Sequence, residues 1–187
     1  MEKIRYNWVS NDELYIKYHD EEWGKPVYDD KVLFEFLVLE SFQAGLSWIT
    51  ILKKRENFRK AFDKFNEKKI VKYNDAKIEE LLQNEGIIRH RGKIEATINN
   101  ARVFQEIQKE FGSFSEYLWN YVNGKPIDNK LKSIKDAVAK TEISDALAKD
   151  LKKRGFKFMG STTVYAFMQA VGMVNDHITS CFCYKKN

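Results

Sequence analysis

An acidic residue lies at the end of an apolar stripe in the most apolar segment of the chain. Glu40 follows Leu33, Phe36 and Leu37 at helical spacing, so it continues a stripe that a helix would bury. A buried carboxylate is costly unless it is paired or hydrogen-bonded. Two interpretations are open. Glu40 is either a helix-end residue that reaches solvent or caps a neighbouring backbone, or a carboxylate on a pocket floor that accepts hydrogen bonds from a ligand amine. The exocyclic amine of an adenine-type base would suit the second.

Aromatic residues are abundant, with 13 Phe, 9 Tyr and 4 Trp in 187 residues. Five of them lie near the N-terminus or close to Glu40: Trp8, Tyr15, Tyr18, Trp23 and Trp48. Tyr15 and Tyr18 are three positions apart and share one face if this segment is helical. Aromatic walls around one carboxylate form a slot for a flat, electron-poor base. The alternative is an ordinary aromatic core.

Two basic turns stand next to glycines at predicted helix junctions. The first contains Arg89, Arg91, Gly92 and Lys93, and the second, at residues 152–157, contains Lys153 and Arg154. Cations and backbone amides at such a junction can bind a phosphate. Each run taken alone is typical of a solvated surface, but the pair favours a DNA-backbone contact.

A third group of residues has metal-ligand chemistry. His19 lies near one end of the chain, and His177 and Cys181 lie four positions apart near the other end. This spacing allows one metal ion to bind both. Cys183 is a further thiol, and no strong fourth ligand is evident. A zinc ion joining the terminal segments and a set of ordinary buried or solvent-facing side chains are both open.

Composition restricts the function classes. With 32 basic and 27 acidic residues the net charge is +5, which mildly favours a polyanionic partner. We find no glycine-rich phosphate loop and no serine-hydrolase triad, so no redox or nucleotide cofactor is expected. There is no signal-peptide pattern and no apolar run approaching the ~20 residues of a membrane span. Two cysteines do not suggest a disulfide framework. A soluble protein of the cytosol, without a membrane partner, is expected.

Helical periodicity dominates, and strand alternation is absent. Residues 32–43 are apolar on nearly all sides, which predicts a central helix, and Ser47 is expected to cap the next one. Further helices are predicted over residues 75–84, 94–111, 117–122 and 144–154, with Gly155 ending the last of these. Ser161 is expected to cap a final apolar helix. Residues 127–140 are predicted to be a surface connection. The fold class is therefore all-α.

Several blocks in one order resemble the bacterial 3-methyladenine DNA glycosylase I family, and together they span nearly the whole chain. They are WVS at residues 8–10, LYI at 14–16, YHDEEWG at 18–24, LE at 39–40, QAGLSW at 43–48, LKKRE at 52–56, GIIRHRGKI at 86–94, LKKRGFKF at 151–158 and VNDH at 174–177.

This resemblance implies the helix-hairpin-helix glycosylase fold, here as one domain over residues 1–187. Its helical core would span roughly residues 30–160, with the N- and C-terminal segments packed together. The implied activity is monofunctional release of free 3-methyladenine from alkylated double-stranded DNA by a monomer in the bacterial cytosol. The resemblance also assigns Glu40 to the damaged base, first for recognition and second for catalysis. It places Tyr15, Tyr18 and Trp48 as base contacts, with Trp8, Trp23 and Gln43 nearby.

In this family the hairpin and the basic turns hold DNA, and a structural zinc is bound by Cys, His, His and Cys. His19, His177 and Cys181 match three of the four zinc positions, whereas Tyr6 replaces the first cysteine. Either the zinc site is lost, or Cys183 or water completes it.

Overall fold

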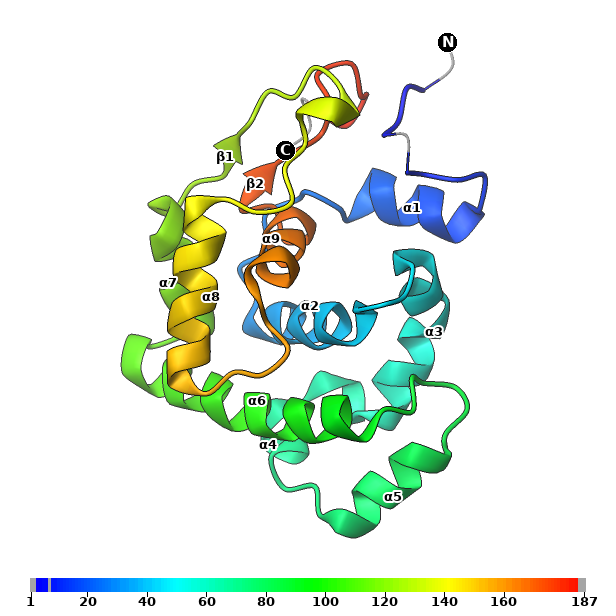
Figure 1. Cartoon of the computed structure of the whole chain (residues 1–187), viewed down its shortest axis with the longest axis vertical. Helices are drawn as coiled ribbons and strands as arrows, with labels where there is room; N and C mark the ends of the chain where they lie inside the picture. Colours follow the sequence, from blue (N-terminus) through cyan, green and yellow to red (C-terminus); the bar gives the residue numbers. More distant parts are fainter. Residues whose placement is uncertain (1–2, 7, 185–187) are drawn as a thin grey trace.

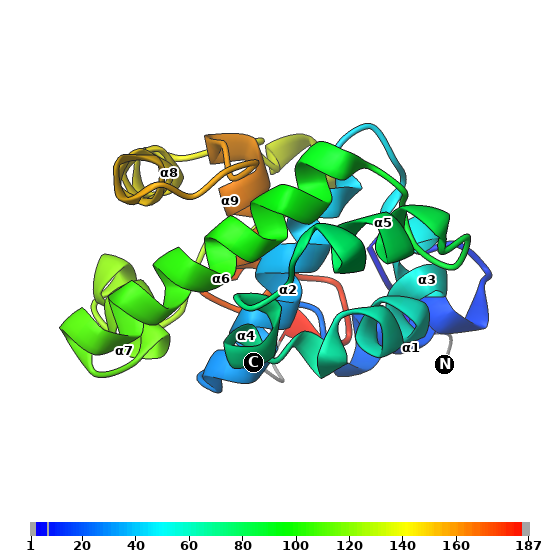
Figure 2. The same cartoon turned by 90° about the horizontal axis from the view of Figure 1, so that it is seen from below.

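The computed structural model describes residues 3–6 and 8–184, and helices account for most of them (Figure 1). The prediction of an all-α fold is confirmed. The centre of the molecule is α2 (Asp30–Gln43), which begins where the Asp29 carboxylate accepts a hydrogen bond from the backbone N–H of Val32. Every residue from Leu33 to Phe42 is buried, as the apolar pattern predicts. Figure 2 shows α6 crossing the molecule over α2.

The remaining helices surround α2. They are α1 (Glu13–Glu21), α3 (Trp48–Ala61), α4 (Glu67–Ile70), α5 (Asp75–Gln83), α6 (Arg91–Phe111), α7 (Phe114–Trp119), α8 (Glu142–Arg154) and α9 (Ser161–Ala170), with the 3₁₀ turns η1 (Asp63–Phe65), η2 (Asn120–Val122) and η3 (Ile134–Asp136). None of the helices in the described residues is long and apolar enough to cross a membrane.

Helices α8 and α9, with the short turn between them, form a helical hairpin. Gly155 ends α8 with φ of +106°, a backbone conformation that glycine adopts without a Cβ penalty. The prediction that Ser161 caps α9 is wrong by one position, because Gly160 is the N-cap residue and Ser161 begins the helix. The Ser161 hydroxyl instead hydrogen-bonds the Ser144 hydroxyl at 2.9 Å, which ties the start of α9 to the first turn of α8.

The N- and C-terminal segments lie side by side, as predicted (Figure 1). The backbone N–H of Phe182 donates to the carbonyl of Ile4. A short parallel pair that the sequence pattern did not indicate, β1 (Ile127–Asp128) with β2 (Val174–Asn175), attaches the connection before α8 to the C-terminal segment. Residues 127–140 are therefore more than a surface connection.

Candidate functional site

A pocket of about 280 Å³ opens where the terminal segments meet the central helix. Its lining includes every residue that the sequence analysis proposed for base binding. The lining residues are Tyr6, Trp8, Tyr15, Tyr18, Trp23, Glu40, Gln43, Trp48, Ile134, Ala137, Ala166 and Gln169. The volume and the aromatic walls suit a single planar ligand of nucleobase size.

Glu40 lies in the last turns of α2 and lines this pocket. Glu40 is only 4% exposed. No donor in the described residues hydrogen-bonds or ion-pairs with its carboxyl group. Burial raises the pKa of Glu40 from the usual 4.5 to about 8. The interpretation of Glu40 as a solvent-reaching helix end is therefore wrong. The carboxyl keeps its lone pairs for a ligand.

Aromatic rings surround this carboxyl and pack against one another. The ring centroids of Trp8 and Tyr15 are 4.9 Å apart, and those of Tyr18 and Trp48 are 5.7 Å apart. Trp23 meets Trp8 edge-on at 5.2 Å. Burial, and then the nearby Glu40, raise the pKa of the Tyr18 phenol well above 10. The slot is thus walled by aromatic rings that pack against one another around a buried carboxyl.

Trp48 brings one unpaired donor to the pocket wall. Its indole Nε1 is buried and makes no hydrogen bond of ordinary geometry with the described residues. It lies close enough to the Tyr18 phenol to offset a small part of the rise in the Tyr18 pKa. An unpaired buried donor is uncommon in native proteins and often marks a functional site.

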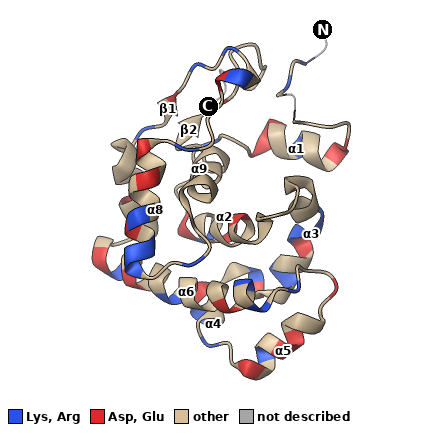
Figure 3. Ribbon diagram, viewed as in Figure 1, with Lys and Arg blue, Asp and Glu red and all other residues tan. Residues whose placement is uncertain are grey.

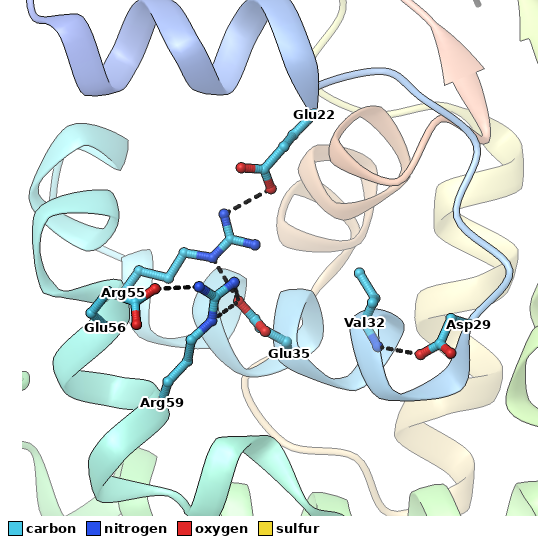
Figure 4. Close-up of polar contacts among 7 residues, drawn as sticks. All are labelled: Glu22, Asp29, Val32, Glu35, Arg55, Glu56 and Arg59. Atoms are coloured by element: carbon cyan, nitrogen blue, oxygen red, sulfur yellow. Dashed lines mark hydrogen bonds and ion pairs between the residues drawn. The ribbon is translucent and has the colours of Figure 1, made fainter.

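An ion-pair network holds the helices that carry the pocket walls (Figure 4). The guanidinium of Arg55 on α3 donates to Glu35 on α2 at 2.6 Å and to Glu22, the residue that follows α1, at 2.8 Å. Arg59 donates to Glu35 as well, and also to Glu56. Because α1, α2 and α3 carry Tyr18, Glu40 and Trp48, the network fixes the geometry of the slot.

Several pocket residues were not predicted as base contacts. Ile134 and Ala137 come from the connection assigned to the surface, and Ala166 and Gln169 come from the final helix. Tyr6, which stands at the family's first zinc position, instead contributes a ring 5.7 Å from that of Trp23. Ala166 and Gln169 are three positions apart on a helix, a spacing that could have indicated a shared face.

The structure places Lys93 differently from its predicted role as a DNA contact. Lys93 is 6% exposed, and its Nζ donates to the carbonyls of Phe42 at 2.9 Å and Ala44 at 3.1 Å. The ammonium group therefore caps the C-terminal end of α2, where carbonyls lack helical partners. Burial lowers the pKa of Lys93. Its buried ammonium supports the turn after Glu40 and is not presented to a phosphate.

The two predicted basic turns meet in space. The Asn100 amide on α6 donates to the carbonyl of Lys157 and accepts from its N–H, both at 2.9 Å, which docks the α8–α9 hairpin on α6. A Cβ on Gly92 would lie 3.2 Å from the His90 ring and 3.7 Å from Phe158, so a small residue suits this close approach. Gly92 and Phe158 therefore bring the two basic turns close together on the surface.

The cations of these turns differ in availability. Arg89 and Arg91 are half exposed, although Arg89 lies 4.0 Å from Glu85 and Arg91 pairs with Glu79 and Glu95. Lys153 is exposed in the last turn of α8, where Figure 3 shows basic residues. Arg154, by contrast, donates to Asp150 at 2.7 Å and to Glu110 at 2.6 Å. The guanidinium of Arg154 thus ties α8 to the end of α6, while Lys153 and Arg89 keep freer charges.

The predicted metal-ligand residues cluster in the buried junction of the terminal segments. Cys181 Sγ lies 3.6 Å from both His19 Nε2 and His177 Nδ1. The ligand atoms of His19, Cys181 and Cys183 all lie within 4.8 Å of one another. With the usual Zn–S and Zn–N bonds, a tetrahedral zinc separates a sulfur and a nitrogen ligand by about 3.6 Å. The donor atoms of His19, Cys181 and Cys183 are therefore close enough together to hold a zinc ion, and His177 Nδ1 adjoins Cys181.

Comparison with known proteins agrees with this geometry. The family described as methyladenine glycosylase matches residues 8–184. The chain is 51% identical to the DNA-3-methyladenine glycosylase of Haemophilus influenzae, over 96% of this chain and 97% of the relative. It is 50% identical to DNA-3-methyladenine glycosylase 1 of Escherichia coli, over 98% of each.

Solved structures match equally well. A crystal structure of 3-methyladenine DNA glycosylase I superposes with a TM-score of 0.94 at 54% identity, over 96% of this chain and 99% of that one. The Staphylococcus aureus enzyme, described with respect to 3-methyladenine recognition, gives a TM-score of 0.92 at 42% identity, over 94% and 93%. The fold and the aromatic slot are those of a DNA glycosylase. Within that class, the chain belongs to the methyladenine glycosylase family.

Proposed function

We propose that this protein, acting as a monomer on alkylated double-stranded DNA, hydrolyses the N-glycosidic bond of 3-methyladenine and releases the free base. The observation that carries the proposal is the Glu40 carboxyl, buried and unpartnered by the described residues within an aromatic slot of nucleobase size. A ligand that is flat, bears an amine and is cationic would satisfy both the ring walls and the carboxyl.

Methylation at N3 gives adenine a positive charge and weakens its bond to the sugar. The protein extrudes the nucleotide at a cost of a few kcal/mol and holds the base by stacking and by Glu40. Water adds to C1′ of the sugar, the N-glycosidic bond breaks, and its electron pair neutralises the departing base. The proton of the attacking water passes to solvent. Normal adenine is rejected because it lacks the pre-activated bond.

The same pocket argues against strand cleavage. Cleavage by a glycosylase needs an amine that forms a Schiff base with the sugar. No lysine lines the pocket among the described residues, and the nearby Lys93 ammonium is bound by two carbonyls. A monofunctional hydrolase is therefore the activity that the geometry supports best.

Chromatography of the bases released from methylated DNA tests this proposal. We expect 3-methyladenine to be released, with the DNA strand left intact. A DNA-binding module without turnover would bind the DNA and release no base. A regulator that senses nucleobases would bind free 3-methyladenine but not DNA. Either outcome, obtained with folded protein, would overturn the proposed activity.

The His/Cys cluster is proposed as a structural zinc site with His19, His177, Cys181 and Cys183 as ligands. The ring nitrogens outside the cluster are already fixed, because His19 Nδ1 contacts Asp20 at 2.9 Å and His177 Nε2 contacts the Trp23 carbonyl at 3.1 Å. Such outer contacts are typical of metal-bound histidines. Bound zinc would join the terminal segments and supply no chemistry to the reaction.

Metal analysis of purified protein should find about one zinc per chain. The variants Cys181→Ser and Cys183→Ser are expected to lose bound zinc and to melt at a lower temperature, because a structural zinc stabilises the folded state. His90→Ala, the third histidine and outside the cluster, serves as the control and should keep the metal. Protein that binds no zinc even after zinc is added contradicts the site. Retention of zinc by Cys183→Ser alone removes Cys183 as a ligand.

A further inference from the structure

A buried carboxylate lies behind the pocket wall formed by α9. Asp176 is 1% exposed and follows β2. Its Oδ1 accepts from Asn129 Nδ2 at 2.6 Å, and its Oδ2 accepts from the Tyr165 hydroxyl at 2.6 Å and from Gln169 Nε2 at 2.8 Å. It has no ion-pair partner in the described residues. Of the three donors, only Gln169 also lines the pocket.

This contact fixes which way the Gln169 amide faces. A carboxylate only accepts hydrogen bonds, so the amide nitrogen of Gln169 must be the atom that contacts Asp176. Its carbonyl Oε1 is then left without a protein donor in the described part of the chain. The oxygen and nitrogen of a glutamine amide are often hard to tell apart, but here the Asp176 carboxylate decides the assignment.

A second glutamine in the pocket also uses its amide nitrogen to bind the protein. Gln43 Nε2 donates to the backbone carbonyl of Leu46 at 2.9 Å, so the Gln43 amide oxygen is left as the acceptor. No lysine or arginine lines the pocket among the described residues. The Glu40 carboxyl and two amide oxygens are thus available to accept, an arrangement that complements a cationic ligand rich in donors.

We infer that Gln169, oriented by Asp176, supplies a second hydrogen-bond acceptor to the pocket, beside Glu40. This inference rests on the proposed function. The donor is an N–H of the extruded cationic base or an O–H of the attacking water, and the water O–H becomes more acidic as its oxygen bonds to C1′. The uncompensated charge of Asp176 strengthens the acceptor, because it opposes rotation of the amide and favours positive charge in the pocket. Asp176 is a positioning residue in this scheme.

Gln169→Met tests the acceptor, since methionine preserves length and removes both polar atoms. We expect single-turnover release of 3-methyladenine to slow by about ten- to a hundredfold, as loss of a hydrogen bond to a charged partner predicts. Tyr165→Phe is the matched control. It removes another donor to the same Asp176 oxygen, leaves Gln169 in place, and should stay within about threefold of wild type.

Asp176→Asn tests the positioning role. The new amide can donate to Gln169 Oε1 and so permits the glutamine to turn its nitrogen towards the pocket. The rate should fall about as far as in Gln169→Met, and the double variant should be no slower than either single variant. Because residue 176 precedes His177, the zinc content of this variant is measured too. Multiplicative losses in the double variant would show that Asp176 does not act through Gln169.

The affinity for free 3-methyladenine, measured by tryptophan fluorescence, distinguishes a donor on the base from a donor on the attacking water. If the base donates, Gln169→Met weakens free-base binding and slows release together. If water donates, release slows while free-base affinity is unchanged. Wild-type rate and affinity in folded Gln169→Met would overturn the inference. Failure of the proposed function is distinct, since wild-type protein itself would then release no 3-methyladenine.

Discussion

Glu40→Gln is expected to slow single-turnover release of 3-methyladenine by roughly a hundredfold or more, with little change in affinity for undamaged DNA. Glutamine has the same shape but carries no charge, and half of its polar end donates where the base also donates. The carboxyl is 4% exposed and has no protein partner in the described residues, so its interaction with a cationic base is not weakened by water. Loss of such an interaction in a dry site costs about 2–4 kcal/mol.

The comparison needs a second variant and a control. Glu40→Ala should lose at least as much activity, because it removes the carboxyl and leaves a gap beside the base. Glu21→Gln changes the same residue type at an exposed position of α1 and should behave as wild type. Circular dichroism confirms that each variant is folded. Wild-type release by both Glu40 variants would remove this residue from base recognition.

The prediction of the pocket from sequence depended on α2. Its apolar pattern places Glu40 among buried residues, and aromatic residues that follow or precede it in the chain supply the walls. The contribution of α9 was missed because its sequence is that of a core helix. No local pattern shows that Gln169 and Ala166 face a cavity. The cavity exists only once the chain termini and α9 are packed around α2.

Lys93 illustrates the opposite error. A lysine beside Gly92 at the start of a helix has the local signature of a phosphate contact. Its actual partners are carbonyls at Phe42 and Ala44, about fifty positions earlier in the chain. Burial against a distant helix end is a tertiary property, so neighbouring cations of one turn can differ, with Arg89 half exposed and Lys93 buried. The docking of the second basic turn on α6 through Asn100 was likewise invisible in the sequence.

Burial of Glu40 should make the free energy of unfolding depend on pH. The pKa of Glu40 is about 8 in the folded protein, against the usual 4.5. Between these values the folded protein holds a proton on Glu40 that the unfolded chain has lost. The free energy of unfolding therefore decreases as the pH rises through this window. The slope is about 1.4 kcal/mol per pH unit, which accumulates to about 4–5 kcal/mol by pH 8 and then levels off.

Other groups titrate over the same range, so the measured quantity is the difference between wild type and Glu40→Gln. Glutamine has no proton to lose, and its variant should gain stability relative to wild type as the pH rises from 5 to 8. Urea unfolding at several pH values, without ligand, gives both curves. Curves that stay parallel would mean that the carboxyl ionises as it does in water, which is incompatible with a dry pocket floor. Divergence of the expected sign links the instability directly to the group that binds the damaged base: burial disfavours the Glu40 carboxylate in the empty pocket, and a cationic ligand would favour it.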